Sequence, residues 1–149
     1  MKNLVCPISS EKTPEYMPRI VAAYVIGLLL AYIFTGFLPI IVFLVFDYAL
    51  RGYGLQRYSL LNLLARSTGN LFKGEQFLID KAPKEFAARI GLLLTFTALL
   101  FELVHVEQVA SIIAIVIVVF ATLESAFKFC VGCLMYTWIV LPLYNRRNR

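Results

Sequence analysis

The residues in this chain with the greatest chemical reactivity are its three cysteines. Cys130 and Cys133 lie three residues apart near the C-terminus, and Cys6 lies near the N-terminus. Residues three apart on a helix share a face at roughly 5–6 Å, which is within reach of a disulfide if the backbone relaxes. Gly132, between the two cysteines, permits that relaxation. The spacing is typical of a redox pair or of a metal site.

Thiol chemistry is the preferred interpretation of this pair. One of Cys130 and Cys133 would be the nucleophile and the other the resolving thiol, in thiol–disulfide exchange or sulfur transfer. Cys6 would be a third thiol that receives or relays sulfur. Lys128 is close in sequence and would favour the thiolate. Because thiols that face the cytosol are normally reduced, a purely structural disulfide is not expected.

Two other interpretations of the cysteines stay open. In one, Cys6, Cys130 and Cys133 are metal ligands for a copper(I)-like soft ion, or the entry site of a transporter for such an ion or a small sulfur species. Zinc would need a fourth ligand, which the sequence does not offer. In the other, the chain is a structural membrane subunit whose cysteines pack as small apolar side chains. The sequence does not establish that the chain is an enzyme. It identifies no cofactor, and no motif supports a membrane quinone as electron acceptor.

The composition indicates whether the chain is a soluble protein or a membrane protein. Of the 149 residues, 60% are hydrophobic and only 15% are charged, and the mean hydropathy is +0.80. Soluble domains usually carry about a quarter charged residues. A water-soluble fold would have to expose much of the apolar surface, so the sequence predicts a single integral membrane domain with the lipid bilayer as its surroundings.

Apolar runs place the membrane spans. A spanning helix needs about 20 mostly apolar residues. The long first run is interrupted around Gly36 and Pro39, which punctuate a helix. The sequence therefore predicts an all-α protein with four transmembrane helices arranged as two hairpins. The alternative is one long kinked helix in place of the first hairpin, and three spans. No cleavable signal peptide is visible. The predicted spans cover residues 17–34, 38–51, 86–104 and 109–127.

Positive charge predicts the orientation. Lys and Arg crowd the N-terminal segment, the segment between the two hairpins and the C-terminal tail, whereas the two short outer loops contain none. Cytoplasmic segments carry this excess of basic residues. Both termini are therefore expected in the cytoplasm, with the protein a multi-pass protein of the inner, cytoplasmic membrane. The basic flanks explain the net charge of +5, so nucleic-acid binding is not implied.

Two further apolar segments are predicted beside the spans. Residues 53–68 carry Leu55, Tyr58, Leu61 and Leu64 at three-residue spacing, which suits an amphipathic helix in the membrane interface that ends at residues 69–70. The alternative is a surface loop. Residues 134–144 are apolar but too short to span, and Pro142 is expected to stop them. They either continue the fourth helix or turn at Gly132, which would place Cys133 near a helix N-terminus.

Four charged residues fall near the inner ends of the second and fourth spans, with the acid four residues before the base in each. Such residues are costly in a membrane and usually face the bundle interior. They could form a proton relay, but we favour ion pairs within each helix that hold the spans together and shape the local field. His105, in the outer turn, is expected to be an interfacial residue. The four residues are Asp47, Arg51, Glu124 and Lys128.

The two halves of the chain also look alike. Residues 14–20 before the first hairpin resemble residues 83–90 before the second, and both second helices end in an acid–base pair. Both hairpins would enter from the same side, so a repeat would be related by an axis along the membrane normal.

Several motifs resemble one known family. They are Cys6-Pro7-Ile8-Ser9, the residues 47–51, residues 82–88 with Gly91, and Phe129-Cys130-Val131-Gly132-Cys133 with Tyr136. Together they are similar to the small bacterial membrane proteins catalogued as domain of unknown function 4395. The aromatic tail beyond Tyr136 departs from the pattern. The resemblance implies the membrane topology and directs attention to the cysteines, but it implies no settled activity. A thioredoxin-like or rhodanese-like partner protein would favour the sulfur and redox interpretation.

Overall fold

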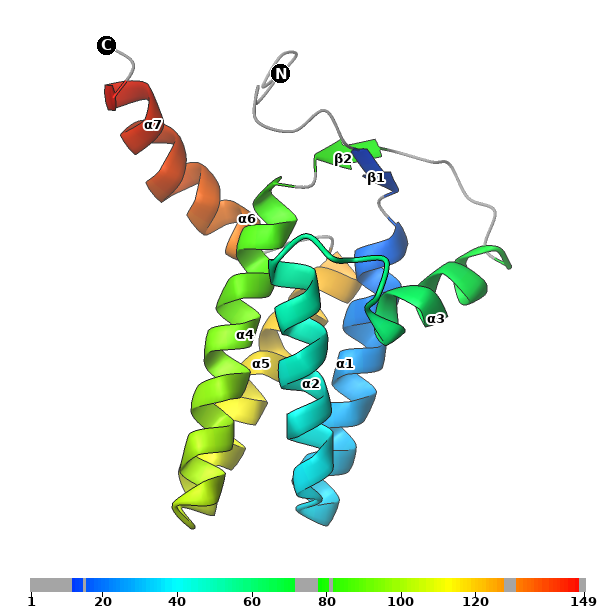
Figure 1. Cartoon of the computed structure of the whole chain (residues 1–149), viewed down its shortest axis with the longest axis vertical. Helices are drawn as coiled ribbons and strands as arrows, with labels where there is room; N and C mark the ends of the chain where they lie inside the picture. The colour runs from blue at the N-terminus through cyan, green and yellow to red at the C-terminus, as the bar shows by residue number, and fades with distance from the viewer. Residues whose placement is uncertain (1–11, 15, 72–77, 81, 128–130, 148–149) are drawn as a thin grey trace.

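Four long helices lie side by side and make up most of the chain (Figure 1). The computed structural model describes residues 12–14, 16–71, 78–80, 82–127 and 131–147; within these, the side chains of residues 12, 13, 78–80, 82, 83 and 133 lie outside the description. The sequence predicted helices over 17–34, 38–51, 86–104 and 109–127. The four helices are α1 (Tyr16–Thr35), α2 (Leu38–Gly52), α4 (Ala82–Leu103) and α5 (Glu107–Phe127).

Two tight reversals join these helices in pairs. Gly36, between α1 and α2, has a φ of 63°, and His105, between α4 and α5, has a φ of 61°. Glycine adopts this left-handed conformation without steric cost. Pro39 lies in the first turn of α2, where its missing N–H needs no partner. The side chain of His105 is exposed and lies outside the core of the bundle.

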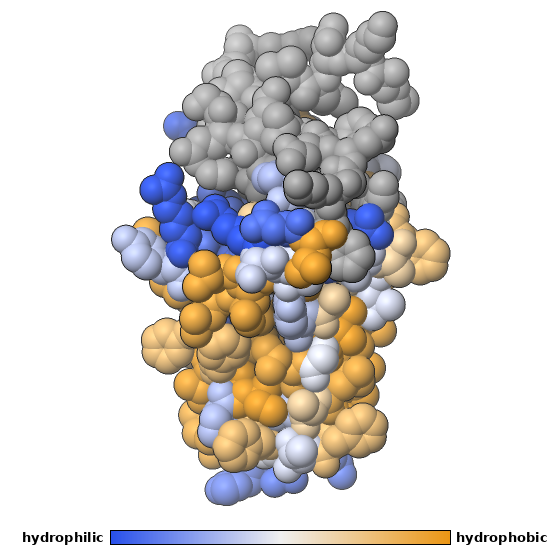
Figure 2. All heavy atoms as spheres, turned by 90° about the vertical axis from the view of Figure 1, so that its right-hand side faces the viewer, coloured by the Kyte–Doolittle hydropathy of each residue, from blue (hydrophilic) through white to orange (hydrophobic). Residues whose placement is uncertain are grey.

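Three of the helices are long and apolar enough to cross a membrane, namely α1, α4 from Lys84 onward, and α5. On the face of the molecule shown in Figure 2, apolar side chains form a broad band with hydrophilic residues above and below it. Phe34, Leu93 and Ile112 are among the exposed apolar residues. The chain is thus a helical membrane protein. α2 has only 15 residues, which is fewer than a spanning helix usually needs.

Small side chains allow the helices of the core to approach closely. α1 buries Val21, Val25 and Leu29 at four-residue spacing, and α5 turns Ala110 and Ala114 toward the core. In a membrane, helices associate through close van der Waals packing, and alanine permits it. These buried residues therefore form a row of close contacts along the bundle axis.

Each of the two halves of the chain packs its helices mainly against the helices of the other half. α1 packs mainly on α5, and α2 packs mainly on α4, so the first helix of each half contacts the second helix of the other. Arg19 Nε donates to the Ser125 carbonyl at the end of α5 (3.1 Å), and Arg89 Nε donates to the Gly52 carbonyl at the end of α2 (2.9 Å). Each arginine thereby satisfies a carbonyl in the last turn of a helix.

The structure also contains a pair of short strands, which the sequence did not predict. β1 (Lys12–Pro14) pairs antiparallel with β2 (Leu78–Asp80). Each strand precedes the first long helix of its half by one residue. The repeat noted in the sequence aligns residues 14–20 with 83–90, so the two strands do not occupy its equivalent positions, whereas Arg19 and Arg89, with their matching bonds to helix-end carbonyls, do.

The central segment forms a shorter helix than predicted. α3 covers Leu60–Gly69, while residues 53–59 form turns. The expected helix over 53–68 is therefore wrong in its first half, because Gly54 has a φ of 80° and Ser59 caps the helix. Leu55 and Tyr58 are exposed in these turns. α3 packs against α1 and points away from the bundle (Figure 1).

The C-terminal tail is helical over its described length. It consists of α6 (Val131–Met135), the π-helical turn η1 (Tyr136–Val140) and α7 (Leu141–Arg147). The expectation that Pro142 stops this segment is wrong. Leu141 N–H donates to the Tyr136 carbonyl, five residues back, and this wider turn immediately precedes the proline. Because proline lacks an N–H and its ring crowds the preceding turn, local widening lets the helix continue.

Candidate functional site

The structure describes only part of the predicted cysteine site. Cys6 and Cys130 lie outside the described residues, and for Cys133 the backbone alone is described. That backbone lies in α6 (Val131–Met135). Residues 128–130 lie outside the description, so a turn near Gly132 and a continuation of the fourth helix both stay predictions. Convergence of the three thiols stays a prediction. Among the described residues, no group of three His, Cys, Asp or Glu side chains could hold a metal ion, and the soft-metal hypothesis stays untested.

Contacts with α4 position the helix that carries Cys133. A Cβ built on Gly132 would lie 2.5 Å from the Cβ of Ala87 and 2.7 Å from its Cα. Real Cβ atoms do not approach this closely, so only glycine lets α6 lie against α4 here. One turn later, the rings of Tyr136 and Phe86 make a tilted contact, with their centroids 5.6 Å apart and their planes at 60°. α6 therefore begins against the first turns of α4.

A cavity of about 110 Å³ opens beside this contact, between the long helices. We call it the central pocket. It lies at the end of the bundle where α1 and α4 begin and α2 and α5 end, which we call the α3 end. Val131, Gly132 and Met135 of α6 form part of its wall. Its apolar lining includes Met17, Val21, Ala22, Val25, Ala87, Ala88, Leu94, Ile117, Phe120 and Ala121.

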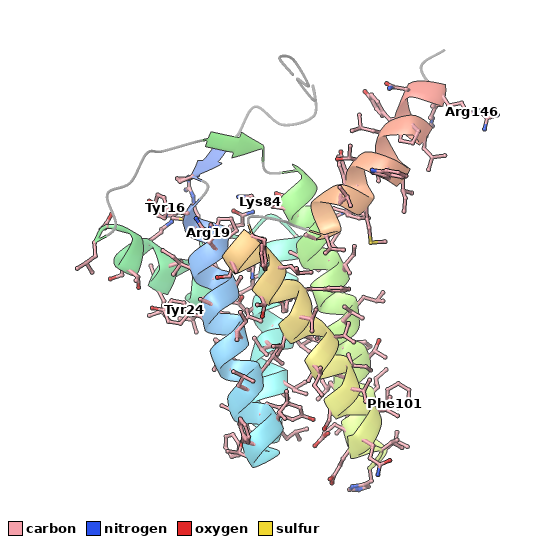
Figure 3. All side chains as sticks on the ribbon, turned by 180° about the vertical axis from the view of Figure 1, so that it is seen from behind. Tyr16, Arg19, Tyr24, Lys84, Phe101 and Arg146 are labelled. Atoms are coloured by element: carbon pink, nitrogen blue, oxygen red, sulfur yellow. The ribbon has the colours of Figure 1, made fainter. Side chains whose placement is uncertain are left out.

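Six polar side chains line the same pocket: Tyr48, Arg51, Gln56, Asn62, Lys84 and Glu124. The Arg51 guanidinium lies 5.3 Å from the centre of the Tyr48 ring, in a cation–π arrangement. Glu124 lies close enough to Arg51 and Lys84 for both cations to act on its charge. Figure 3 shows Lys84 with Arg19 at the α3 end of the bundle, far from Phe101. The predicted site residues Arg51 and Glu124 thus meet in one pocket.

Glycine also makes room for the tyrosine of this pocket. A Cβ on Gly91 would lie 2.5 Å from Cε1 of Tyr48, so the tyrosine ring of α2 lies directly on the backbone of α4. The ring is 9% exposed. Tyr48 and Glu124 both line the pocket, so a hydroxyl and a carboxylate are among its polar groups.

The side chain of Asp47 links α2 to α3 and pairs with Arg51. Its Oδ2 lies 3.8 Å from Nη1 of Arg51, which is the predicted ion pair. Its Oδ1 accepts a 2.6 Å hydrogen bond from the Ser59 hydroxyl and a 3.3 Å bond from Leu61 N–H. Ser59 Oγ in turn accepts from Asn62 N–H. The carboxylate therefore ties the end of α2 to the first turn of α3.

Sequence reasoning missed Ser59 and Tyr48, and a signal existed for only one of them. Ser59 directly precedes the run Leu60–Ala65, and serine in that place is a common helix N-cap. Nothing local marks Tyr48, because its place in the pocket depends on Gly91 more than 40 residues away. The second predicted ion pair, Glu124 with Lys128, falls partly outside the description, since Lys128 is not among the described residues.

Comparison with known proteins gives one family. The family model described as domain of unknown function DUF4395 matches residues 13–140. This range includes the Cys130–Cys133 pair and the whole central pocket but not Cys6. No curated protein and no solved structure matches the chain.

Proposed function

We propose that this chain, which belongs to the DUF4395 family, carries out thiol–disulfide or sulfur-transfer chemistry through the Cys130–Cys133 pair at the central pocket. The observation that carries the proposal is the contact of Gly132 with Ala87. It holds α6, the helix that contains Cys133, against α4 at the wall of a pocket that Arg51 and Lys84 also line. Nearby cations favour a thiolate.

In the exchange reaction, one thiolate of the pair attacks a disulfide of a partner, and the partner releases one thiolate. The second cysteine then attacks the mixed disulfide. The Cys130–Cys133 bond forms and the partner leaves as a dithiol, so two electrons pass from the pair to the partner. A thioredoxin-like protein supplies such a disulfide. In the sulfur-transfer version, a rhodanese-like persulfide passes its outer sulfur to the thiolate and leaves as a thiol.

Four spans complete the proposed arrangement. α2 crosses the membrane with α1 as one hairpin, and α4 with α5 forms the second. The α3 end then faces the cytoplasm with both termini, and α3 lies in the inner-leaflet interface of a cytoplasmic membrane. Support comes from the basic residues that cluster at this end and from the exposed Leu63 and Leu64 of α3 beside Arg66.

The test is the reactivity of each thiol as a function of pH. We would measure alkylation rates of the purified wild type and of Cys6→Ser, Cys130→Ser and Cys133→Ser. One thiol of the pair is expected to titrate below the ordinary value of about 8.5, and a redox buffer should close the Cys130–Cys133 bond reversibly. Ser67→Cys in a cysteine-free background is the matched control, because residue 67 is exposed on α3. Thiols that react no faster than this control, with no reversible disulfide, would refute the proposal.

A further inference from the structure

The C-terminal helical segment over residues 131–147, which we call the tail helix, extends away from the bundle for most of its length. Its first part, α6, packs on α4, whereas α7 packs mainly on the turn η1 that precedes it. Neither η1 nor α7 contains a buried residue. In Figure 1, α7 runs outward from the bundle on the side opposite to α3. The tail helix therefore presents a surface that the rest of the described chain does not cover.

Exposed apolar side chains surround most of this helix. With 3.6 residues per turn, these side chains point in directions that together cover most of its circumference. A helix at the boundary between a protein and water shows one apolar stripe, whereas a helix that is apolar on most sides is found in apolar surroundings. A protein packed along the tail helix would cover one side of it, whereas lipid can cover all of them. The exposed apolar residues are Leu134, Met135, Trp138, Ile139, Leu143 and Tyr144.

Contacts with α4 set the depth at which the tail helix leaves the bundle. The membrane-spanning part of α4 begins at Lys84. The tail helix contacts Ala87 through Gly132 and Phe86 through Tyr136. At 1.5 Å per residue, these contacts lie within about 5 Å of the beginning of the span. The tail helix therefore starts near the boundary between the hydrocarbon core and the lipid headgroups.

The composition of the tail helix suits this boundary. Tryptophan and tyrosine, here Trp138 and Tyr144, are enriched at membrane interfaces. Arg146 and Arg147 follow them, and residues 131–147 contain no Asp or Glu. Figure 3 shows Arg146 at the far end of the tail helix, well away from Lys84. Clustered basic residues next to a membrane attract anionic lipid headgroups.

We propose that the tail helix binds the anionic phospholipid surface at the α3 end of the bundle. Its apolar side chains lie among the upper parts of the acyl chains, and Arg146 and Arg147 bind the phosphates. α3 provides a second contact on the opposite side, since it presents exposed Leu63 and Leu64 beside Arg66. Contacts on two opposite sides limit the tilt of the bundle in the membrane.

Lipid binding by the tail helix also bears on the central pocket. Val131, Gly132 and Met135 of α6 line that pocket, and α6 is continuous with η1 and α7. Anchoring the tail helix in the membrane therefore holds one wall of the pocket in place. The inference is independent of the thiol chemistry, because it rests on residues other than the cysteines.

The fluorescence of Trp138 tests the lipid contact directly, because this residue is the only tryptophan in the chain. The full chain is placed in nanodiscs of phosphatidylcholine with one third phosphatidylglycerol. Some lipids carry bromine near the headgroup end of the acyl chain (shallow) or near its methyl end (deep). We expect blue-shifted emission, stronger quenching by shallow than by deep bromine, and iodide quenching roughly threefold weaker than for free tryptophan, as suits an interfacial ring.

Phe96→Trp in a Trp138→Phe background is the depth control, because Phe96 is exposed near the middle of the span in α4. There, deep bromine should quench more strongly than shallow bromine. Strong iodide quenching of Trp138 without quenching by brominated lipid would place the tail helix in water and overturn the proposal. A blue shift that neither quencher affects would mean that protein, such as a second copy of the chain, covers the tail helix, and would overturn it as well.

The charge of the lipid is tested with bromine on one lipid at a time. Brominated phosphatidylglycerol should quench Trp138 about twofold more than brominated phosphatidylcholine at the same mole fraction, because the arginines gather anionic lipid. Arg146→Gln/Arg147→Gln should bring this ratio close to one. Arg57→Gln/Arg66→Gln, which removes two exposed arginines on the α3 side, is the matched control and should leave the ratio unchanged. A ratio of one in the wild type, or an equal fall in both variants, overturns the assignment of anionic phospholipid.

Discussion

Gly132 and Ala87 are in direct backbone-to-side-chain contact, and a Cβ on Gly132 would come within 2.5 Å of the Ala87 Cβ. This contact joins the tail helix to α4 at the wall of the central pocket. It explains why a residue with no side chain lies between the two cysteines of the pair. The glycine serves the packing of two helices, in addition to any freedom it gives the local backbone.

Gly132→Ala should therefore destabilise the protein by about 1–3 kcal/mol, because an added methyl group overpacks a tight contact. It should also slow closure of the Cys130–Cys133 disulfide. Gly27→Ala is the matched control, since a Cβ there meets nothing within 4 Å, and alanine gains up to about 1 kcal/mol over glycine in a helix. Thermal unfolding in detergent compares the two. If both substitutions stabilise the protein, the helix contact is not tight.

Asp47 and Ser59 lead to a second prediction. Ser59→Ala removes the 2.6 Å hydrogen bond to the buried carboxylate and the cap on Asn62 N–H. The expected cost is about 1–3 kcal/mol, because a buried charged acceptor loses a donor. Hydrogen exchange should show faster opening of α3 than of α1. Ser67→Ala, on the exposed face of the same helix, should leave both the stability and the exchange rates unchanged. Similar exchange in the two variants would argue against the cap.

Local sequence patterns predicted the helices well, whereas features that depend on contacts between distant residues could not be predicted. The run before Gly36 predicted a helix over 17–34, and the structure has Tyr16–Thr35, because hydropathy and turn residues act within one segment. The π-helical turn before Pro142 was missed, since it depends on how a continuing helix accommodates a proline. The pocket was missed as well. The pocket forms where Tyr48 contacts Gly91 and where α6 contacts Ala87. Neither contact can be predicted from the residues next to these positions in the sequence.

Tyr32 and Glu102 connect the two halves of the chain at the opposite end of the bundle. The Tyr32 hydroxyl donates a 2.6 Å hydrogen bond to Oε2 of Glu102. Tyr32→Phe should cost about 1.5–3 kcal/mol, which is typical of a bond to a charged group. In a double-mutant cycle with Glu102→Gln, the two effects should be non-additive. Tyr144→Phe, on an exposed ring of α7, is the control and should be neutral in thermal unfolding. Additive effects would show that the two side chains are not coupled.

The short length of α2 makes its membrane crossing the feature most open to test. Its 15 residues rise about 22 Å, against a hydrocarbon core of about 30 Å. Local thinning of the bilayer and the turns at residues 53–58 would accommodate the difference. We expect Phe37→Cys and His105→Cys, in a cysteine-free background, to react with a membrane-impermeant maleimide added to intact cells. Arg57→Cys should react only after permeabilisation. Labelling of residue 57 from the same side as residue 37 would show that α2 returns without crossing, which leaves three spans and places the termini on opposite sides.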